Sequence, residues 1–397
     1  MSPSRIGIRA SSFTVGLVAI ALLGAVGVDA GSERISRNHH RVALNTVALS
    51  PAREASLSWP AGSRAAASRS SWATEQSVTD ATARAGWKKP SGSSRKIRID
   101  GPIKGEVAYD RTLGRYDLYR VRLQGGGETA TGKLLRPRQG EGPFPAVLVN
   151  DGRELNSAAL EYLLPEFGDV VVLSLDYPDA LPYDLDPLTM LLQSDRMRRE
   201  LRRIPRLFSL GGAYLTQRAD VDSSRVAMVV TSFAVPFGVR AAAEDERFRN
   251  VGLIYGAGEL GTVLKANLTV KPRFLRSVAA WLASQLYDEF EPTHYIAGIA
   301  PRTVIMVNGR DDRQMPVRAV QALYDAAREP KTLIWLTTGH LLPTNTPLIR
   351  ALVDTTLTRL PVLRSPPPEG SRSMIPPITT PLGGRACARA CLSHKSR

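Results

Sequence analysis

Cysteine and histidine are scarce in this chain of 397 residues. The only cysteines, Cys387 and Cys391, lie close to the C-terminus, so neither a disulfide nor a cysteine metal site can hold the folded region. Of the five histidines, only His294 and His340 lie outside the terminal segments. Two histidines without a cysteine cannot form the usual zinc ligand sets, and the pattern H-E-x-x-H is missing. We therefore expect no metal ion.

Nucleotide-binding motifs are missing as well. The sequence contains neither a Walker A loop nor a G-x-G-x-x-G pattern directly after an expected strand. A nucleotide or dinucleotide cofactor is therefore not indicated, and we expect no cofactor.

The chain is basic, with a net charge of +15, but the excess lies at its two ends. Residues 1–100 contain 14 Lys and Arg against 6 Asp and Glu, and residues 361–397 contain 6 against 1. Between 101 and 360 the remaining 32 basic and 30 acidic residues nearly balance. A nucleic-acid-binding domain more often carries its basic patch on the folded surface. The distribution therefore favours solvated basic tails and no nucleic-acid partner.

The two ends of the chain are expected to lie outside the folded domain. Residues 1–30 join a short basic start to an apolar run and to small residues before Gly31, which is typical of a signal peptide and predicts export to the periplasm or the medium. An uncleaved N-terminal anchor, which would associate the protein with a membrane, stays open. Residues 31–95 are expected to form a flexible linker, and the basic, Pro-rich residues 361–397 a disordered tail. The folded domain is then expected over 96–360.

Within that domain, apolar runs alternate with segments of helical spacing. Six runs are nearly continuous in apolar residues, as is typical of strands buried on both faces: PAVLVN, DVVVLSLDY, RVAMVVTS, NVGLIYGA, RTVIMVNG and KTLIWLTT. Helices are expected over SAALEYLLPEF, SDRMRRELRRIPRLF, FGVRAAAEDERF, SVAAWLASQLYDEF and VRAVQALYDAAR. YDLYRVRL and ATGKLLRP, on either side of the glycines at 125–127, predict an antiparallel pair. The pattern predicts an α/β fold with a mostly parallel, doubly wound sheet covered by helices, in a single domain.

Polar residues of particular chemistry follow four of the expected strands. Asp151 and Gly152 come after PAVLVN, Ser232 after RVAMVVT, Asp312 shortly after RTVIMVNG, and His340 shortly after KTLIWLTT. Ligands of such sheets bind outside the carboxyl ends of the strands, so these residues are expected to lie near one another. Their chain order of Ser, acid and His is the order found in α/β hydrolases.

Serine hydrolysis requires each of these residue types. An imidazole, here His340, must accept the hydroxyl proton of Ser232 while the bond to the acyl carbon forms, and a carboxylate must orient the imidazole ring. Backbone N–H groups must also face the developing oxyanion, and each contributes roughly 3 kcal/mol. The candidates for this oxyanion hole are the amides of Phe233, Asp151 and Gly152.

Residues 110–360 resemble the dienelactone hydrolase, acetyl xylan esterase and prolyl-oligopeptidase-like branch of the α/β hydrolases. The resemblance lies in PFPAVLVNDG, SSRVAMVVTSFAVPFGVRAAA, VNGRDDRQMP and TTGH. The third motif matches G-x-x-D-x-x-V-P, and this alignment assigns the acid to Asp312 and not to Asp311. The resemblance implies an α/β-hydrolase fold and esterase or lipase-like activity on a small-molecule ester. The usual G-x-S-x-G elbow is V-T-S-F-A here, so Val230 stands where the family usually has glycine.

Other residues compete for the catalytic roles. Ser209 precedes two glycines but follows a helical segment, and His294 precedes a strand, so both are expected to be structural. Asp311 and Glu259 are alternatives for the acid. The Arg-rich segment at 196–203 is expected to be a solvated helix face, with recognition of an anionic substrate as its alternative.

The leading hypothesis is therefore a carboxylic ester hydrolase with Ser232, Asp312 and His340 as its triad. A noncatalytic α/β-hydrolase homologue of the cell envelope, which binds a ligand or partner, is the alternative, and the bulky Val230 motivates it. Substrate specificity, a lid and the oligomeric state are not specified by the sequence.

Overall fold

The computed structural model of the protein describes residues 73–76, 97–140, 142–152, 156–162, 168–181, 191–270, 274–341 and 346–363. The expected signal peptide or anchor at 1–30, most of the expected linker and nearly all of the C-terminal tail lie outside the described residues. The proposed domain bounds therefore stay a prediction. None of the helices within the described ranges is both long and apolar enough to cross a lipid bilayer.

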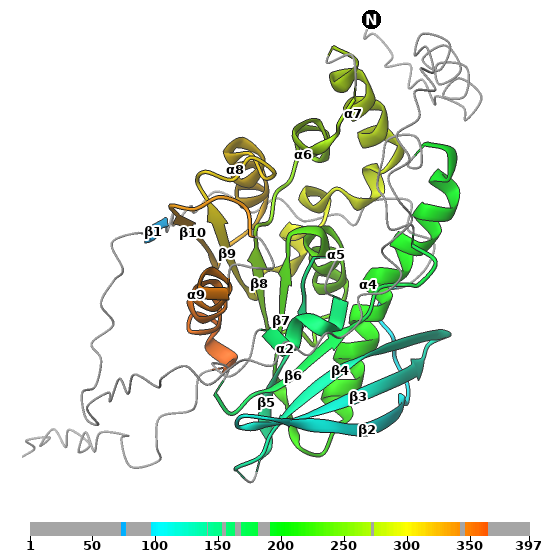
Figure 1. The fold of residues 1–397 in the computed structure, drawn as a ribbon, viewed down its shortest axis with the longest axis vertical. Helices are drawn as coiled ribbons and strands as arrows, with labels where there is room; N and C mark the ends of the chain where they lie inside the picture. The colour runs from blue at the N-terminus through cyan, green and yellow to red at the C-terminus, as the bar shows by residue number, and fades with distance from the viewer. Residues whose placement is uncertain are drawn as a thin grey trace, which may run out of the picture. The chain divides into compact units, whose positions relative to one another are not determined.

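A ten-stranded sheet forms the centre of the described domain (Figure 1). The strands are β1 (Ala73–Gln76), β2 (Lys104–Leu113), β3 (Tyr116–Gly125), β4 (Glu128–Pro137), β5 (Phe144–Asn150), β6 (Val171–Leu175), β7 (Val221–Thr231), β8 (Asn250–Ile254), β9 (Thr303–Gly309) and β10 (Lys331–Leu336). Their order across the sheet is β1-β10-β9-β8-β7-β5-β6-β4-β3-β2. The strands from β10 to β6 in this order run parallel. At one edge β4 pairs antiparallel with β6, β3 with β4, and β2 with β3. At the other edge β1 pairs antiparallel with β10.

This topology confirms the expected α/β fold with its mostly parallel sheet. The six apolar runs are the six parallel strands β5 to β10, and the pair around the glycines at 125–127 is β3 and β4. Strands β2 and β1 were not expected. β2 has four charged residues among ten and is largely exposed at the sheet edge, so it lacks the apolar pattern on which the strand predictions depend.

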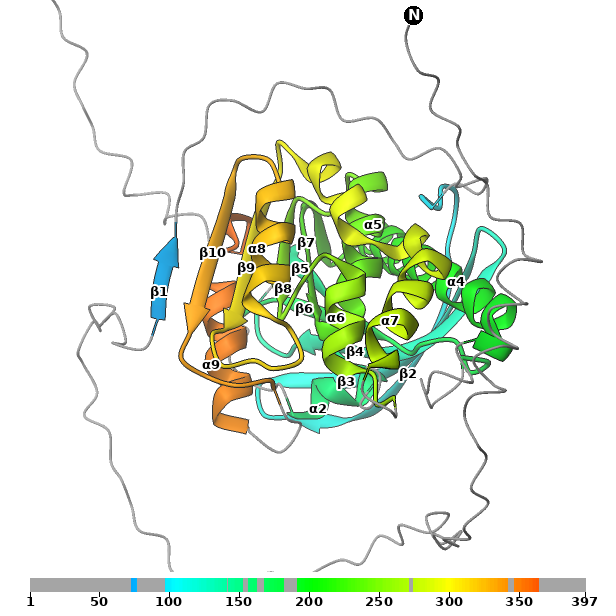
Figure 2. The same ribbon diagram turned by 90° about the horizontal axis from the view of Figure 1, so that it is seen from above.

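Helices cover both faces of the sheet, as Figures 1 and 2 show. The longer helices are α4 (Ser194–Gln217), α5 (Val235–Glu244), α6 (Leu260–Asn267), α7 (Leu275–Leu286), α8 (Val317–Ala326) and α9 (Thr346–Leu357), and the short α2 spans Ala159–Tyr162. Alternate residues of β7 enter different cores: Met228 and Val230 pack with α4, α5 and α8, while Val229 packs with α9. Burial on both faces explains why the parallel strands read as continuous apolar runs.

Helix α6 was not expected, and its N-terminus shows why. The residue before the helix, Glu259, supplies no side-chain cap. Instead the buried carboxylate of Glu291, far along the chain, accepts hydrogen bonds from the backbone N–H groups of Glu259 (3.1 Å) and Leu260 (2.6 Å). A carboxylate at a helix N-terminus is favourable both as an acceptor and as a charge. Because this cap comes from a distant residue, the local sequence carries no start signal for α6.

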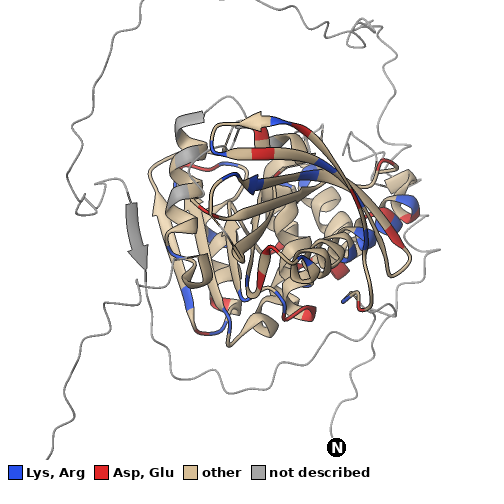
Figure 3. Cartoon of the chain, turned by 90° about the horizontal axis from the view of Figure 1, so that it is seen from below, with Lys and Arg blue, Asp and Glu red and all other residues tan. Residues whose placement is uncertain are grey.

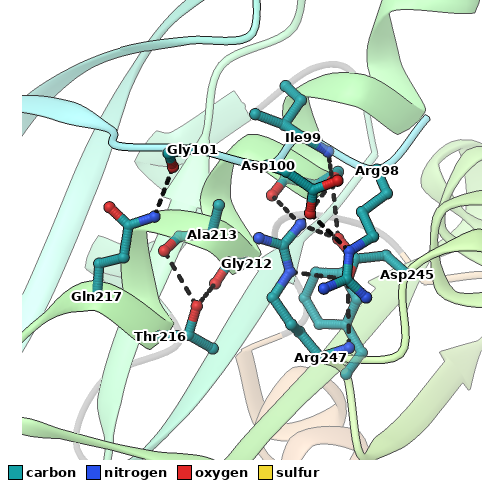
Figure 4. A network of polar contacts seen from close by, with 12 residues as sticks. Arg98, Ile99, Asp100, Gly101, Gly212, Ala213, Thr216, Gln217, Asp245 and Arg247 are labelled. Carbon is teal, nitrogen blue, oxygen red and sulfur yellow. Dashed lines mark hydrogen bonds and ion pairs between the residues drawn. The ribbon is translucent and has the colours of Figure 1, made fainter. Parts of the chain in front are cut away.

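A buried polar network ties the N-terminal end of the described domain to its helices (Figure 4). Ser209 of α4 donates to the carboxylate of Asp245 (2.7 Å) and accepts from the backbone N–H of Ile99 (2.9 Å). Arg247 donates to both Asp245 (2.8 Å) and Ser209 (3.0 Å). Ser209 and Asp245 are fully buried, so these hydrogen bonds satisfy groups that water cannot reach.

Candidate active site

Ser232 lies on a sharp turn between β7 and α5. The preceding Thr231 is still extended, whereas Ser232 has φ of 50°, in the left-handed region that non-glycine residues rarely adopt. A short 3-10 helix, η2 (Ser232–Ala234), then leads directly into α5. A strained residue between a strand and a helix is the geometry of a nucleophile elbow, which exposes the hydroxyl at the edge of the sheet.

The structure brings the three residues of the expected triad together. Ser232 Oγ lies 3.2 Å from His340 Nε2, and His340 Nδ1 lies 2.7 Å from Asp312 Oδ2. The side chain of Asp312 is fully buried and that of His340 is 13% exposed. The three side chains come from loops after β7, β9 and β10, so they meet although up to 108 residues separate them in the chain.

The backbone holds Asp312 in place. Its second carboxylate oxygen, Oδ1, accepts hydrogen bonds from the N–H groups of Gln314 (2.7 Å) and Met315 (3.0 Å), which leaves Oδ2 for His340. The loops after β9 and β10 also bind each other, because Asp311 N–H donates to Thr338 O at 3.1 Å. Asp312 is thus an oriented carboxylate and not a solvated one.

Tyr255 is hydrogen-bonded to the loop after β10 that carries His340. Directly after β8, it has φ of 52°, is fully buried, and donates its hydroxyl to Gly339 O at 2.9 Å. Its ring centroid lies 5.0 Å from that of His340. Burial raises the pKa of Tyr255 to about 12, so the hydroxyl stays protonated and able to donate at neutral pH. We did not predict this residue, although it follows a strand just as the triad residues do.

The expected oxyanion-hole residues lie beside the elbow. Asn150 of β5 is paired in register with Val230 of β7, so Asp151 and Gly152 leave the sheet next to Ser232. The hydroxyl of Tyr177 donates to Asp151 O, and its ring contacts Phe233 edge-on at 5.5 Å between centroids. Tyr177 therefore links the two loops whose amides are the candidates, a role that sequence analysis missed.

Val230 fits under the elbow because α5 has no side chain there. A β-carbon at position 238 would lie 2.6 Å from Val230 Cγ2, and Gly238 therefore leaves room for the two methyl groups of Val230. Val230 is fully buried in the core. The departure from the usual elbow sequence is thus accommodated by a glycine one turn into the following helix.

The competing residues lie elsewhere. Ser209 belongs to the buried network with Asp245 and Arg247. His294, in the 3-10 helix η4 (Pro292–His294), is 3.9 Å from Asp288. Asp311 is exposed, and Glu259 accepts hydrogen bonds from Arg318 and Thr262. None of these four has a contact with Ser232 or His340 among those described.

The Arg-rich start of α4 makes ion pairs with acidic side chains of neighbouring elements; Figure 3 draws Lys and Arg in blue and Asp and Glu in red. Arg198 and Arg202 each donate to Glu289 at 2.9 and 2.6 Å, and Arg203 and Arg206 both donate to Glu128 of β4. These contacts bind α4 to β4 and to η3 (Asp288–Phe290). Three arginines of the segment, Arg198, Arg202 and Arg203, therefore have a structural role in these ion pairs.

A cavity of about 320 Å³ opens beside the nucleophile. Both Ser232 and Phe233 line it, together with residues of α4, α5 and α6. Its volume is at the lower end of the usual range for small-molecule sites. Within the described ranges, the cavity included, no cluster of three His, Cys, Asp or Glu side chains could hold a metal ion.

The chain has the α/β-hydrolase fold, as its sequence motifs predicted. An acetyl xylan esterase from Thermoanaerobacterium sp. JW/SL YS485 is similar with a TM-score of 0.50 and 18% identity, over 66% of this chain and 89% of that one. An acetyl xylan esterase from Paenibacillus sp. R4 has a TM-score of 0.47 and 16% identity, over 64% and 88%. A glucuronoyl esterase from Solibacter usitatus has a TM-score of 0.44 and 12% identity, over 66% and 89%. No protein-family model and no curated protein matches the sequence.

Proposed function

We propose that this protein is a serine hydrolase that cleaves carboxylic esters through a covalent acyl intermediate on Ser232. The hydrogen-bonded chain from Ser232 through His340 to Asp312, at a strained elbow, is the observation that carries the proposal. The acetyl xylan esterase that shares the fold is an ester hydrolase by name, which favours an ester over an amide.

In the first half of the reaction, Ser232 Oγ attacks the ester carbonyl carbon while His340 Nε2 accepts its proton. Asp312 Oδ2 stabilises the imidazolium that forms. The N–H of Phe233 and an N–H from Asp151 or Gly152 donate to the carbonyl oxygen as it becomes an oxyanion. The tetrahedral intermediate then collapses, and the alcohol leaves with the proton from His340.

In the second half, water replaces the alcohol. His340 Nε2 accepts a proton from the water as its oxygen attacks the acyl carbon, and the bond to Ser232 Oγ breaks with return of that proton. The products are a carboxylic acid and an alcohol, and the enzyme regains its initial state.

Labelling of the purified protein with a fluorophosphonate, followed by peptide mapping, tests the proposal. We expect a single modified residue, Ser232, together with hydrolysis of 4-nitrophenyl esters. Ser232→Ala should lose both, while Ser277→Ala, which alters an exposed serine of α7, should lose neither. Absence of both labelling and turnover would contradict the proposal and favour a ligand-binding homologue without catalysis.

We also propose export, from the sequence of residues 1–30, which lie outside the described part of the chain. N-terminal sequencing of periplasmic or secreted protein should find a start near Gly31. Recovery from the cytosol alone, with Met1 intact, would contradict it.

A further inference from the structure

The cavity beside Ser232 has an apolar wall that continues from the elbow itself. The ring centroids of Phe233 and Phe237 are 5.3 Å apart, and those of Phe237 and Phe290 are 5.7 Å apart. Leu260 and Val263 of α6 line the cavity as well. Among the described residues that line it, none is charged.

Two polar side chains in this wall, those of Tyr287 and Asn267, are engaged with the protein, and a third, Gln314, is exposed. The hydroxyl of Tyr287 donates to the sulfur of Met197 at 3.2 Å. The amide nitrogen of Asn267 donates to the backbone oxygens of Val263 (2.8 Å) and Gln314 (2.9 Å). A charged group in this space would lose its hydration without gaining a partner of opposite charge, and a group rich in hydroxyls would meet a mostly apolar wall, which is unfavourable. A hydrocarbon chain would instead gain from leaving water.

The position of His340 decides which half of an ester faces the cavity. The leaving oxygen must lie within hydrogen-bond reach of His340 Nε2 to receive its proton, so the alcohol part lies on the histidine side. Ser232 and Phe233 line the cavity, whereas His340 is not among its described lining residues. The acyl carbon, which becomes bonded to Ser232 Oγ, is therefore the part of the ester whose substituent extends into the cavity.

We propose that the cavity is an acyl pocket, and that the enzyme prefers esters of uncharged aliphatic acids longer than acetic acid. This inference rests on the proposed function, because it assigns the acyl side from the roles of Ser232 and His340. Each methylene buried in such a pocket favours binding by roughly fourfold. kcat/KM is expected to rise about tenfold or more from acetate to hexanoate.

The test compares 4-nitrophenyl acetate, butyrate and hexanoate in the full chain and in three variants of α6. Val263 is partly buried against the core and lines the cavity, whereas Ala266 on the same helix is exposed. Val263→Trp should lower kcat/KM for hexanoate at least tenfold more than kcat/KM for acetate. Ala266→Trp should change neither. Val263→Phe, a smaller increase in volume, should give the same pattern to a lesser degree if the larger substitution prevents folding.

Labelling of Ser232 by a small fluorophosphonate distinguishes failure of the acyl-pocket inference from failure of the proposed function. If Ser232 reacts but acetate is the best ester, or if Val263→Trp and Val263→Phe slow acetate as much as hexanoate, the acyl pocket is wrong and the hydrolase proposal stands. If Ser232 does not react and no ester is cleaved, the proposed function is wrong and this inference with it.

Discussion

The methyl groups of Val230 occupy the space next to Gly238 in which a side chain on α5 would lie. A β-carbon on residue 238 would approach Val230 Cγ2 to 2.6 Å and Cγ1 to 2.8 Å. The usual elbow has a glycine at the end of the strand. Here the strand has Val230 instead, and Gly238 on the helix leaves the space that its side chain needs. Strand and helix can pass closely only if one of the two positions is small.

This relationship predicts a non-additive pair of substitutions. Val230→Gly should cost about 1–3 kcal/mol of stability through a cavity and added backbone freedom, and Gly238→Ala about the same through overpacking. Combined, they should cost less than the sum, because the new methyl group enters the vacated space. Denaturant unfolding of the four proteins measures this coupling. A large gain in ester turnover with Val230→Gly would show instead that the natural elbow is impaired.

The triad is expected to act as one unit. Ser232→Ala or His340→Ala alone should remove nearly all hydrolysis of a butyrate ester, and the double variant should lose little more, because nucleophile and base take part in the same step. Asp312→Asn should be severe but leave a higher residual rate. Asp311→Asn is the matched control, since Asp311 is exposed. Severe loss in that control, with Asp312→Asn benign, would mean that the acid is misassigned.

Tyr255 is expected to position His340 without touching the substrate. Tyr255→Phe keeps the ring beside the imidazole but removes the hydrogen bond to Gly339, so kcat should fall by about threefold to tenfold with little change in KM. Tyr255→Ala should be more harmful to stability. Steady-state kinetics with melting curves give both quantities. Loss of stability without any change in kcat for Tyr255→Phe would show that the residue only supports the fold.

The network around Ser209 is expected to contribute to stability and not to catalysis. Ser209→Ala leaves Ile99 N–H and one oxygen of buried Asp245 with a partner fewer, which should cost about 1–3 kcal/mol. Ser277→Ala, at an exposed position, is the control and should be neutral. Denaturant unfolding checks the loss, and ester turnover per folded molecule should stay unchanged. A truncated protein that begins at residue 104 lacks Ile99 and its hydrogen bond to Ser209, so it should also be destabilised.

Glu289 is expected to make stability sensitive to acid. Burial alone would raise its pKa, but hydrogen bonds and charges from Arg202 and Arg198 outweigh burial and hold the pKa below its ordinary value. A lowered folded-state pKa stabilises the protein above the unfolded value of about 4.3, and this contribution disappears as the pH falls through the folded pKa. Glu289→Gln should therefore destabilise the protein by roughly 1–2 kcal/mol at pH 7, and this difference should shrink as the pH falls through the folded-state pKa.

The control for this effect is Glu106→Gln on β2, because Glu106 is exposed and lies 3.9 Å from Lys104. Its stability should match that of the natural protein across the same pH range. A pH-independent loss in Glu289→Gln would mean that the carboxylate contributes through packing and not through charge.

Local composition was sufficient to predict the parallel sheet and to place Ser232, Asp312 and His340 after three of its strands. Strands buried on both faces must be apolar throughout, so β5 to β10 could be read directly, and a Ser, an acid and a His at three strand ends could then be placed at one edge. The resemblance to the α/β-hydrolase motif G-x-x-D-x-x-V-P implies Asp312 and not Asp311, and in the structure Asp312 is buried whereas Asp311 is exposed.

Only the tertiary structure decided the features that depend on distant partners. Helix α6 is capped by Glu291, the histidine loop is held by Tyr255, and Val230 is accommodated by Gly238 across a strand–helix contact. The sequence pattern shows which residues are apolar or polar, but it does not show which side chain meets which. The apolar cavity beside Ser232 also depends on distant partners. Its wall is made by residues of α4, α5 and α6, which adjoin one another only once the sheet has formed.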